Sequence, residues 1–103
     1  MSGNIEKGAR AIASIHRLHI LHWLKDPRGH FPPQCDGDLV TDGVCALLIA
    51  DKLGLAQATT AQHLKALVAA GLIIPKKIGK WTLYRRDEAK IAALMKALDS
   101  QIG

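Results

Sequence analysis

Apolar residues recur every three or four positions along most of this chain, which is the period of an amphipathic helix. Two such stripes follow one another near the start: Ile5, Ala9 and Ile12, and then Ile15, Leu18, Leu21 and Leu24. Asn4 and Ser14 stand just before them, and their side chains can cap helices. The pattern therefore predicts a first helix after Asn4 and a second after Ser14 that ends at Asp26-Pro27.

The helical period stops at residue 27. Residues 27–43, PRGHFPPQCDGDLVTDG, contain three prolines and three glycines, which disfavour a regular helix or a long strand. We expect a long irregular loop. Loops above about 12 to 15 residues are uncommon in compact domains and are usually functional or disordered, so this one is a candidate regulatory element.

Helical spacing resumes over residues 44–53, and Gly54-Leu55 then permits a tight turn. A further helix is predicted over residues 57–70, because Thr60, Leu64 and Leu67 share one side of it. Gly71 can close its last turn in a left-handed conformation. Two helices joined by so short a turn form a helix-turn-helix.

Two short strands are predicted next, over residues 73–78 and 81–86, on either side of Gly79-Lys80. Glycine in the first position suits a type II′ hairpin, and Pro75, which lacks an amide proton, places the first strand at a sheet edge. Asp87-Glu88 then starts a last helix with an apolar stripe. The expected fold is mainly α with a small β-hairpin, a single winged helix-turn-helix domain over residues 1–103 in the order α-α-(loop)-α-α-β-β-α.

Charge is sorted along the chain, which has 103 residues and a formal net charge of +5. No acid lies between residues 52 and 86, and the seven bases there are Lys52, Lys65, Lys76, Lys77, Lys80, Arg85 and Arg86. A basic patch confined to the helix-turn-helix and the hairpin is typical of a protein that binds the phosphate backbone of nucleic acid. The alternative is an ordinary solvated lysine face.

Several other classes of protein are disfavoured. No apolar run approaches the 18 to 20 residues that span a bilayer, and charges occupy the place of a signal peptide's apolar region, so we expect a folded cytoplasmic protein. The sequence lacks a Gly-rich phosphate loop, a His-Glu-x-x-His motif and a nucleophile elbow, so we expect neither an enzyme nor a cofactor. Clustered aromatics for stacking single-stranded RNA are also absent.

Three segments resemble those of ArsR/SmtB-type bacterial repressors. AIASIHRLHIL is similar to the ALADPTRLRIL of that family, DKLGLAQATTAQHLKALVAAGLI to its helix-turn-helix, and IGKWTLYRR to its wing, commonly EGRWVYYRL. The resemblance implies a homodimeric repressor on a palindromic operator that a bound effector releases. It also implies a dimer interface on the first and last helices, where the apolar candidates are Ile5, Ala9, Ile12, Ile91, Leu94, Met95 and Leu98. Ala56 and Ala61 depart from the family, since serines that could contact phosphate often stand there.

The residues expected to contact bases lie opposite Leu64 and Leu67, and they are Gln57, Thr59, Gln62 and His63. The alternative for His63 is packing or capping within the domain. Lys52 and Lys65 are expected to contact phosphates, and Lys80 at the wing tip to enter the minor groove. Lys76, Lys77, Arg85 and Arg86 would flank the DNA backbone. Glutamine can form two hydrogen bonds with adenine, which favours an A·T-containing half-site in the operator.

The chain has two cysteines, Cys35 and Cys45, and three hypotheses about their role are considered. A metal such as Zn²⁺ needs three or four thiolate or imidazole ligands, which would require His30 as well, and we expect no metal. A disulfide between the two thiols could act as a redox switch. Unrelated reduced thiols, with Cys45 buried as a small hydrophobe, are the third hypothesis. The chain as a whole has one rival function, a winged helix that binds proteins rather than specific DNA.

Overall fold

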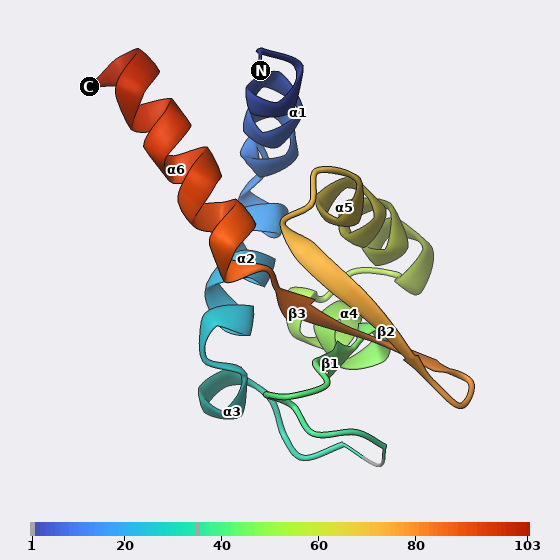
Figure 1. Ribbon diagram of the computed structural model, residues 1–103. Coiled ribbons are helices and arrows are strands. Elements are labelled where there is room, and N and C mark those ends of the chain that lie inside the picture. The colour runs from blue at the N-terminus through green and yellow to red at the C-terminus, as the bar shows by residue number, and fades with distance from the viewer. Residues whose placement is uncertain (1, 35) are drawn as a thin grey trace.

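The computed structural model describes the backbone of residues 2–34 and 36–103 and the side chains of residues 5–34 and 36–103 (Figure 1). The helices are α1 (Ser2–Ile12), α2 (Ile15–Lys25), α3 (Pro27–His30), α4 (Ala46–Leu53), α5 (Gln57–Ala69) and α6 (Glu88–Ile102). The strands are β1 (Val44–Cys45), β2 (Ile73–Ile78) and β3 (Trp81–Arg86). A helix-turn-helix followed by a hairpin confirms the predicted winged fold.

Local signals set most of the helix boundaries. The Ser14 hydroxyl accepts a hydrogen bond from the Arg17 amide at 3.4 Å, and the Asp87 carboxylate accepts one from the Lys90 amide at 3.1 Å. Each bond satisfies an amide that has no partner within the first turn of its helix. Gly71, with φ +78°, follows α5 as predicted. Ala56 starts α5 without a side-chain cap, as its methyl group requires.

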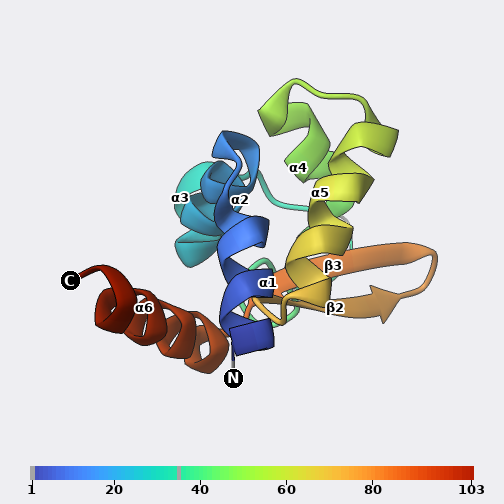
Figure 2. The same ribbon diagram turned by 90° about the horizontal axis from the view of Figure 1, so that it is seen from above.

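The hydrophobic core joins α2, α4, α5 and the sheet. Ile20, Ile49, Leu67 and Leu83 are at most 1% exposed, so each of these four elements contributes a side chain that is removed from water. Figures 1 and 2 place α1 between α6 and α5, and contacts with both helices hold it there. The side of α5 that faces away from this core is therefore left on the surface.

The three strands form an antiparallel sheet in the order β1-β3-β2. Pro75 lies in the edge strand β2 opposite Tyr84, so the predicted edge position is confirmed. Ile78 pairs with Trp81 across the two-residue connection, where Gly79 has φ +58° and no described residue other than glycine has a positive φ. This is the type II′ turn that the sequence predicted.

Three predicted boundaries are wrong. The first helix starts at Ser2, so Asn4 lies inside it rather than capping it. One helical turn, α3, occupies the start of the predicted loop, with Pro27 in the first turn, where a missing amide proton costs little. Val44 and Cys45, predicted to begin a helix, form β1 and pair with Tyr84 and Leu83. The close approach of the neighbouring Gly43 to the Tyr84 backbone makes this pairing possible.

Candidate nucleic-acid interface

The exposed side of α5 carries most of the predicted base-contact residues. Gln57, Thr59 and Gln62 are exposed, whereas Thr60 on the opposite side is buried at 1% exposure. The first two turns of the helix therefore present amide and hydroxyl groups to solvent. Such groups pair with base edges in the major groove.

His63 is half-buried and is bound to α2. Its Nδ1 accepts a hydrogen bond from Arg17 Nε at 3.1 Å, and its ring centroid lies 5.4 Å from that of His16. Burial, and then the charges of Arg17 and His16, lower the pKa of His63 below its ordinary value. The ring is therefore neutral near pH 7 and is positioned by Arg17, a contact that the sequence alone does not predict.

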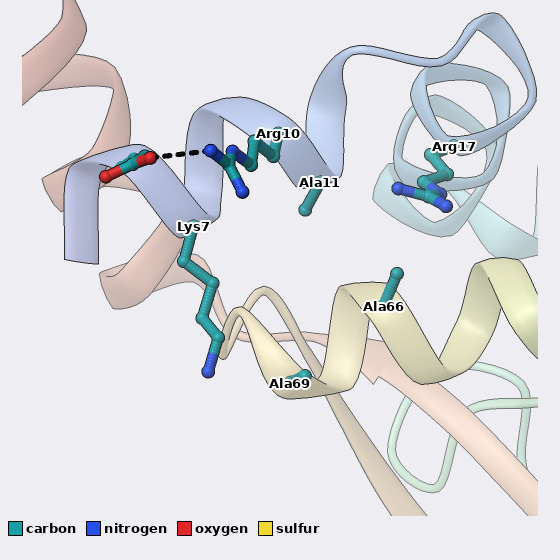
Figure 3. Close-up of a pocket in the computed structure, with 7 residues that line it drawn as sticks. Lys7, Arg10, Ala11, Arg17, Ala66 and Ala69 are labelled. Carbon is teal, nitrogen blue, oxygen red and sulfur yellow. Dashed lines mark hydrogen bonds and ion pairs between the residues drawn. The ribbon is translucent and has the colours of Figure 1, made fainter. Parts of the chain in front are cut away.

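Arg17 also borders a groove between α1, α2 and α5 (Figure 3). The groove bears cations, although none of its lining residues was among the predicted DNA contacts. The only sequence signal at Arg17 was its place in the segment that resembles the repressor family.

Five of the seven predicted cationic contacts are exposed without an ion pair to any described residue: Lys52, Lys65, Lys77, Lys80 and Arg85. The Lys80 ammonium lies 5.2 Å from the centre of the Trp81 ring at the wing tip, and the Lys52 ammonium lies 5.2 Å from the Trp23 ring. Cation–π contacts at the surface are weak, so both ammonium groups stay accessible to a phosphate.

The other two predicted cations are engaged within the chain. Lys76 Nζ pairs with Asp42 Oδ1 at 2.5 Å, and this pair joins β2 to the loop before β1. Arg86 donates to both oxygens of Glu88 at 2.8 Å and to the Leu21 carbonyl at 3.0 Å, and its side chain is 13% exposed. Asp42 and Leu21 are far in the sequence from the residues that they bind, and Glu88 lies just beyond the end of β3. None of these contacts was predicted.

The predicted dimer residues differ in exposure. Leu94 is 8% exposed, and its methyl groups fill the space where a Cβ on Gly8 would stand, so it packs α6 against α1 within one chain. Met95 is 56% exposed, while the remaining five, Ile5, Ala9, Ile12, Ile91 and Leu98, are half-buried. An exposed methionine beside half-buried apolar residues on α1 and α6 leaves apolar surface uncovered.

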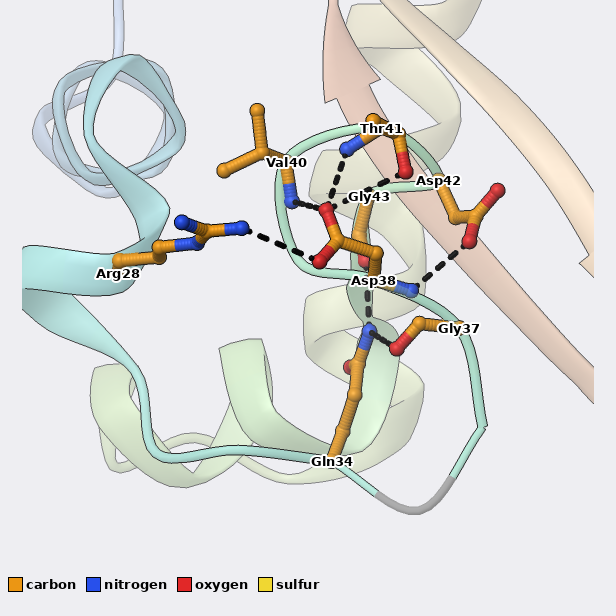
Figure 4. A network of polar contacts seen from close by, with 8 residues as sticks. All are labelled: Arg28, Gln34, Gly37, Asp38, Val40, Thr41, Asp42 and Gly43. Carbon is orange, nitrogen blue, oxygen red and sulfur yellow. Dashed lines mark hydrogen bonds and ion pairs between the residues drawn. The ribbon is translucent and has the colours of Figure 1, made fainter.

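The predicted loop has a definite polar network in its described residues (Figure 4). The Asp38 carboxylate accepts from the Val40 amide at 3.0 Å and from the Thr41 amide at 2.8 Å, and these bonds lower its pKa below the ordinary value. The Gln34 amide donates to the Gly43 carbonyl at 2.7 Å, and its oxygen accepts from the Cys45 amide at 3.0 Å. The loop is thereby tied to β1.

The chemistry predicted for the cysteines is only partly visible. Cys45 is half-buried in β1, immediately before α4, whereas Cys35 lies outside the described residues. Within residues 2–34 and 36–103, no three His, Cys, Asp or Glu side chains gather closely enough to hold a metal ion. In the same part of the chain, no helix is both long and apolar enough to cross a lipid bilayer.

A helix-turn-helix with an exposed polar recognition face and a basic hairpin defines a winged DNA-binding protein. Residues 45–74 match the family described as "Bacterial regulatory protein, arsR family". The chain is 45% identical over 93 residues, which are 90% of this chain and 93% of its relative, to the HTH-type transcriptional regulator YbzH of Bacillus subtilis (strain 168).

Solved structures show the same fold. An ArsR-like transcriptional regulator from Rhodococcus sp. RHA1 has a TM-score of 0.69 at 23% identity, covering 96% of this chain and 79% of its own. The homodimeric winged helix-turn-helix DNA-binding domain Mb0332 from Mycobacterium bovis has a TM-score of 0.66 at 23% identity, covering 97% and 82%. The chain belongs to the ArsR family of winged helix-turn-helix transcriptional regulators, which are DNA-binding proteins and not enzymes.

Proposed function

We propose that this protein is a homodimeric repressor that binds a palindromic operator in the cytoplasm and reads it with α5. One observation carries the proposal: an exposed polar face on α5 adjoins a wing whose Lys77, Lys80 and Arg85 are exposed, and no acid interrupts residues 52–86. Cations would hold the duplex by its phosphates while α5 selects the sequence.

Three side chains are the proposed base readers. Gln57 and Gln62 each carry an amide that can pair with both polar edges of adenine, and Thr59 offers a hydroxyl and a methyl group. His63 would stand at the margin of this face, in a position that Arg17 fixes. Since the intrachain partners of Lys76 and Arg86 compete with phosphate, the main backbone contacts are assigned to Lys52, Lys65, Lys77, Lys80 and Arg85.

The proposed dimer joins the apolar surface that α1 and α6 leave uncovered. Met95 is exposed there, and Ile91 and Leu98 are half-buried beside it. Covering these side chains with a second copy would remove apolar area from water. The Mycobacterium bovis domain of the same fold is homodimeric, which supports the pairing of two copies.

Selection of bound fragments from random duplex DNA tests the proposal. We expect a palindrome whose half-sites are about one helical turn, or roughly 34–36 Å, apart, because two recognition helices related by a two-fold axis must enter successive major grooves. If no sequence is enriched and binding is insensitive to salt, the rival function, a protein-interaction module, is favoured instead.

Regulation by an effector is also proposed for this chain. A thiol response through Cys35 and Cys45 would alter operator binding on oxidation, because Cys45 immediately precedes α4, the first helix of the helix-turn-helix. Operator affinity measured with and without oxidant, and again for Cys45→Ser, tests this. Equal affinities in all cases would show that the thiols do not regulate binding.

A further inference from the structure

A groove of about 450 Å³ separates α1 and α2 from the second half of α5. Ala11, Ala66 and Ala69 provide small apolar side chains along it. The charged residues that line it are Glu6, Lys7, Arg10 and Arg17. Figure 3 shows Lys7 reaching from α1 toward Ala69 and Arg17 extending from α2 toward the same opening. Three cations and one acid thus surround a floor that has no bulky side chain.

The floor of the groove is continuous with the proposed base-reading face. Ala66 and Ala69 lie four and seven positions after Gln62, which places all three on one side of the helix. At 1.5 Å per residue, Gln62 and Ala69 are about 10 Å apart along the axis. A duplex that contacts Gln62 therefore passes beside the groove.

We propose that Lys7, Arg10 and Arg17 form a second phosphate-binding edge, which holds the DNA backbone on the side of α5 opposite the wing. A helix about 10–12 Å wide fills a major groove of about 12 Å, so a sugar-phosphate strand runs along each of its flanks. In Figure 2, α1 and the tip of the hairpin lie on opposite sides of α5. The wing cations serve one strand, and the groove serves the other. This inference rests on the proposed binding of DNA.

The three cations differ in how free they are to bind phosphate. Lys7 is exposed and forms no ion pair with a described residue. Arg10 pairs with Glu6 at 2.8 Å, but both side chains are largely exposed, at 80% and 61%, so solvent weakens the pair. Arg17 uses Nε for His63, and its two terminal amino groups donate to no described residue. A phosphate could bind all three without breaking a buried contact.

The phosphate edge is compatible with the proposed dimer. Ile5, a predicted dimer residue, precedes Lys7 by two positions, which is a rotation of about 200° around a helix. A partner that covers the Ile5 side of α1 therefore leaves Lys7 facing the groove.

The test measures duplex affinity at several salt concentrations for Lys7→Gln and Arg17→Gln. Each phosphate contact contributes about 0.9 to the slope of log K against log salt, so losing one contact per protomer lowers the slope of a dimer by about 1.8. At about 0.15 M salt the affinity should fall roughly fivefold per contact, or roughly 30-fold per dimer. For Lys7→Gln, cognate and random duplexes should lose affinity equally, because phosphates carry no base identity.

Two further variants make the test specific. Lys96→Gln removes an exposed cation from α6, outside the groove, and should leave the slope unchanged. Glu6→Gln removes the acid that competes for Arg10 and should steepen the slope and tighten binding. Arg17→Gln also loses the bond to His63, so its fold is checked by thermal unfolding, and Lys7→Gln, which breaks no ion pair with a described residue, gives the cleaner result.

The outcomes separate this inference from the proposed function. If the wild-type protein binds duplex with a steep salt slope that Lys80→Ala reduces, while Lys7→Gln and Arg17→Gln behave as Lys96→Gln does, the phosphate edge is refuted and DNA binding stands. If the wild-type protein shows no salt-dependent binding, the proposed function fails, and the inference fails with it.

Discussion

Replacing Gly43 with alanine should destabilise the protein more than the same change at any other described glycine with a positive φ. The surroundings of Gly43 leave no room for a side chain. Gly43 has φ +112°, and a Cβ there would stand 2.5 Å from the carbonyl carbon and oxygen of Tyr84. These are backbone atoms of the central strand, so they cannot move aside as a flexible side chain could.

The expected cost has two parts. A side chain at this φ costs about 1–3 kcal/mol in backbone strain. Displacing β1 from β3 also loses the pairing of Val44 with Tyr84 and of Cys45 with Leu83, at about 1 kcal/mol for each hydrogen bond. The sum is about 4 kcal/mol, a large share of the 5–15 kcal/mol that stabilises a typical domain. For a chain of about 100 residues this lowers Tm by roughly 20 °C.

Gly79→Ala is the matched control. Gly79 has φ +58°, but nothing lies within 4 Å of its added Cβ, so only the backbone strain of about 1–2 kcal/mol applies. Urea and thermal unfolding of the two variants, followed by circular dichroism at one protein concentration, give the difference. If Gly43→Ala costs no more than Gly79→Ala, the close approach of Gly43 to β3 does not contribute to stability.

Four other substitutions and one change of pH have defined outcomes. Gln62→Ala should weaken the cognate operator by about 1–3 kcal/mol per protomer and random DNA hardly at all, whereas Lys80→Ala should weaken both; equal losses on the two duplexes would remove Gln62 from the base readers. Met95→Glu should shift the dimer toward monomer in sedimentation equilibrium without changing the helical circular dichroism, since the side chain is 56% exposed. The lowered pKa of His63 means that the unfolded chain binds more protons than the folded one just below pH 6.5, so stability should fall as pH decreases through that region. Arg17→Ala should raise the His63 pKa in an NMR titration, and an unchanged pKa would contradict the role assigned to the Arg17 charge.

The sequence was sufficient for α6 and for the wing, where the structural signals are local. The stripe of α6 repeats every three or four residues, and Asp87 caps it from the adjacent position. The wing could be predicted equally well, because glycine in the first turn position favours the two-residue hairpin whatever the rest of the chain does. A two-residue strand such as β1 has no period to detect, and its partner Tyr84 lies 40 positions away.

The candidate site could be predicted only in part for the same reason. Gln62 is exposed because of its place on the helical wheel, which the sequence contains. The bond between Arg17 and His63 spans 46 positions, and the pair of Lys76 with Asp42 spans 34. The position of Lys7 beside α5 likewise depends on how the helices pack, and the apolar pattern alone does not determine that packing.

The amide of Gln34 has a consequence for how copies of this protein can meet. By accepting from the Cys45 amide of β1 and donating to the carbonyl of the adjacent Gly43, it takes up polar groups at this edge that a neighbouring strand would otherwise bind. At the opposite margin of the sheet, Pro75 has no N–H to offer and Lys76-Lys77 add charge. Both margins therefore resist the strand-to-strand stacking that leads to fibrils, and self-association of the folded protein is left to its helices.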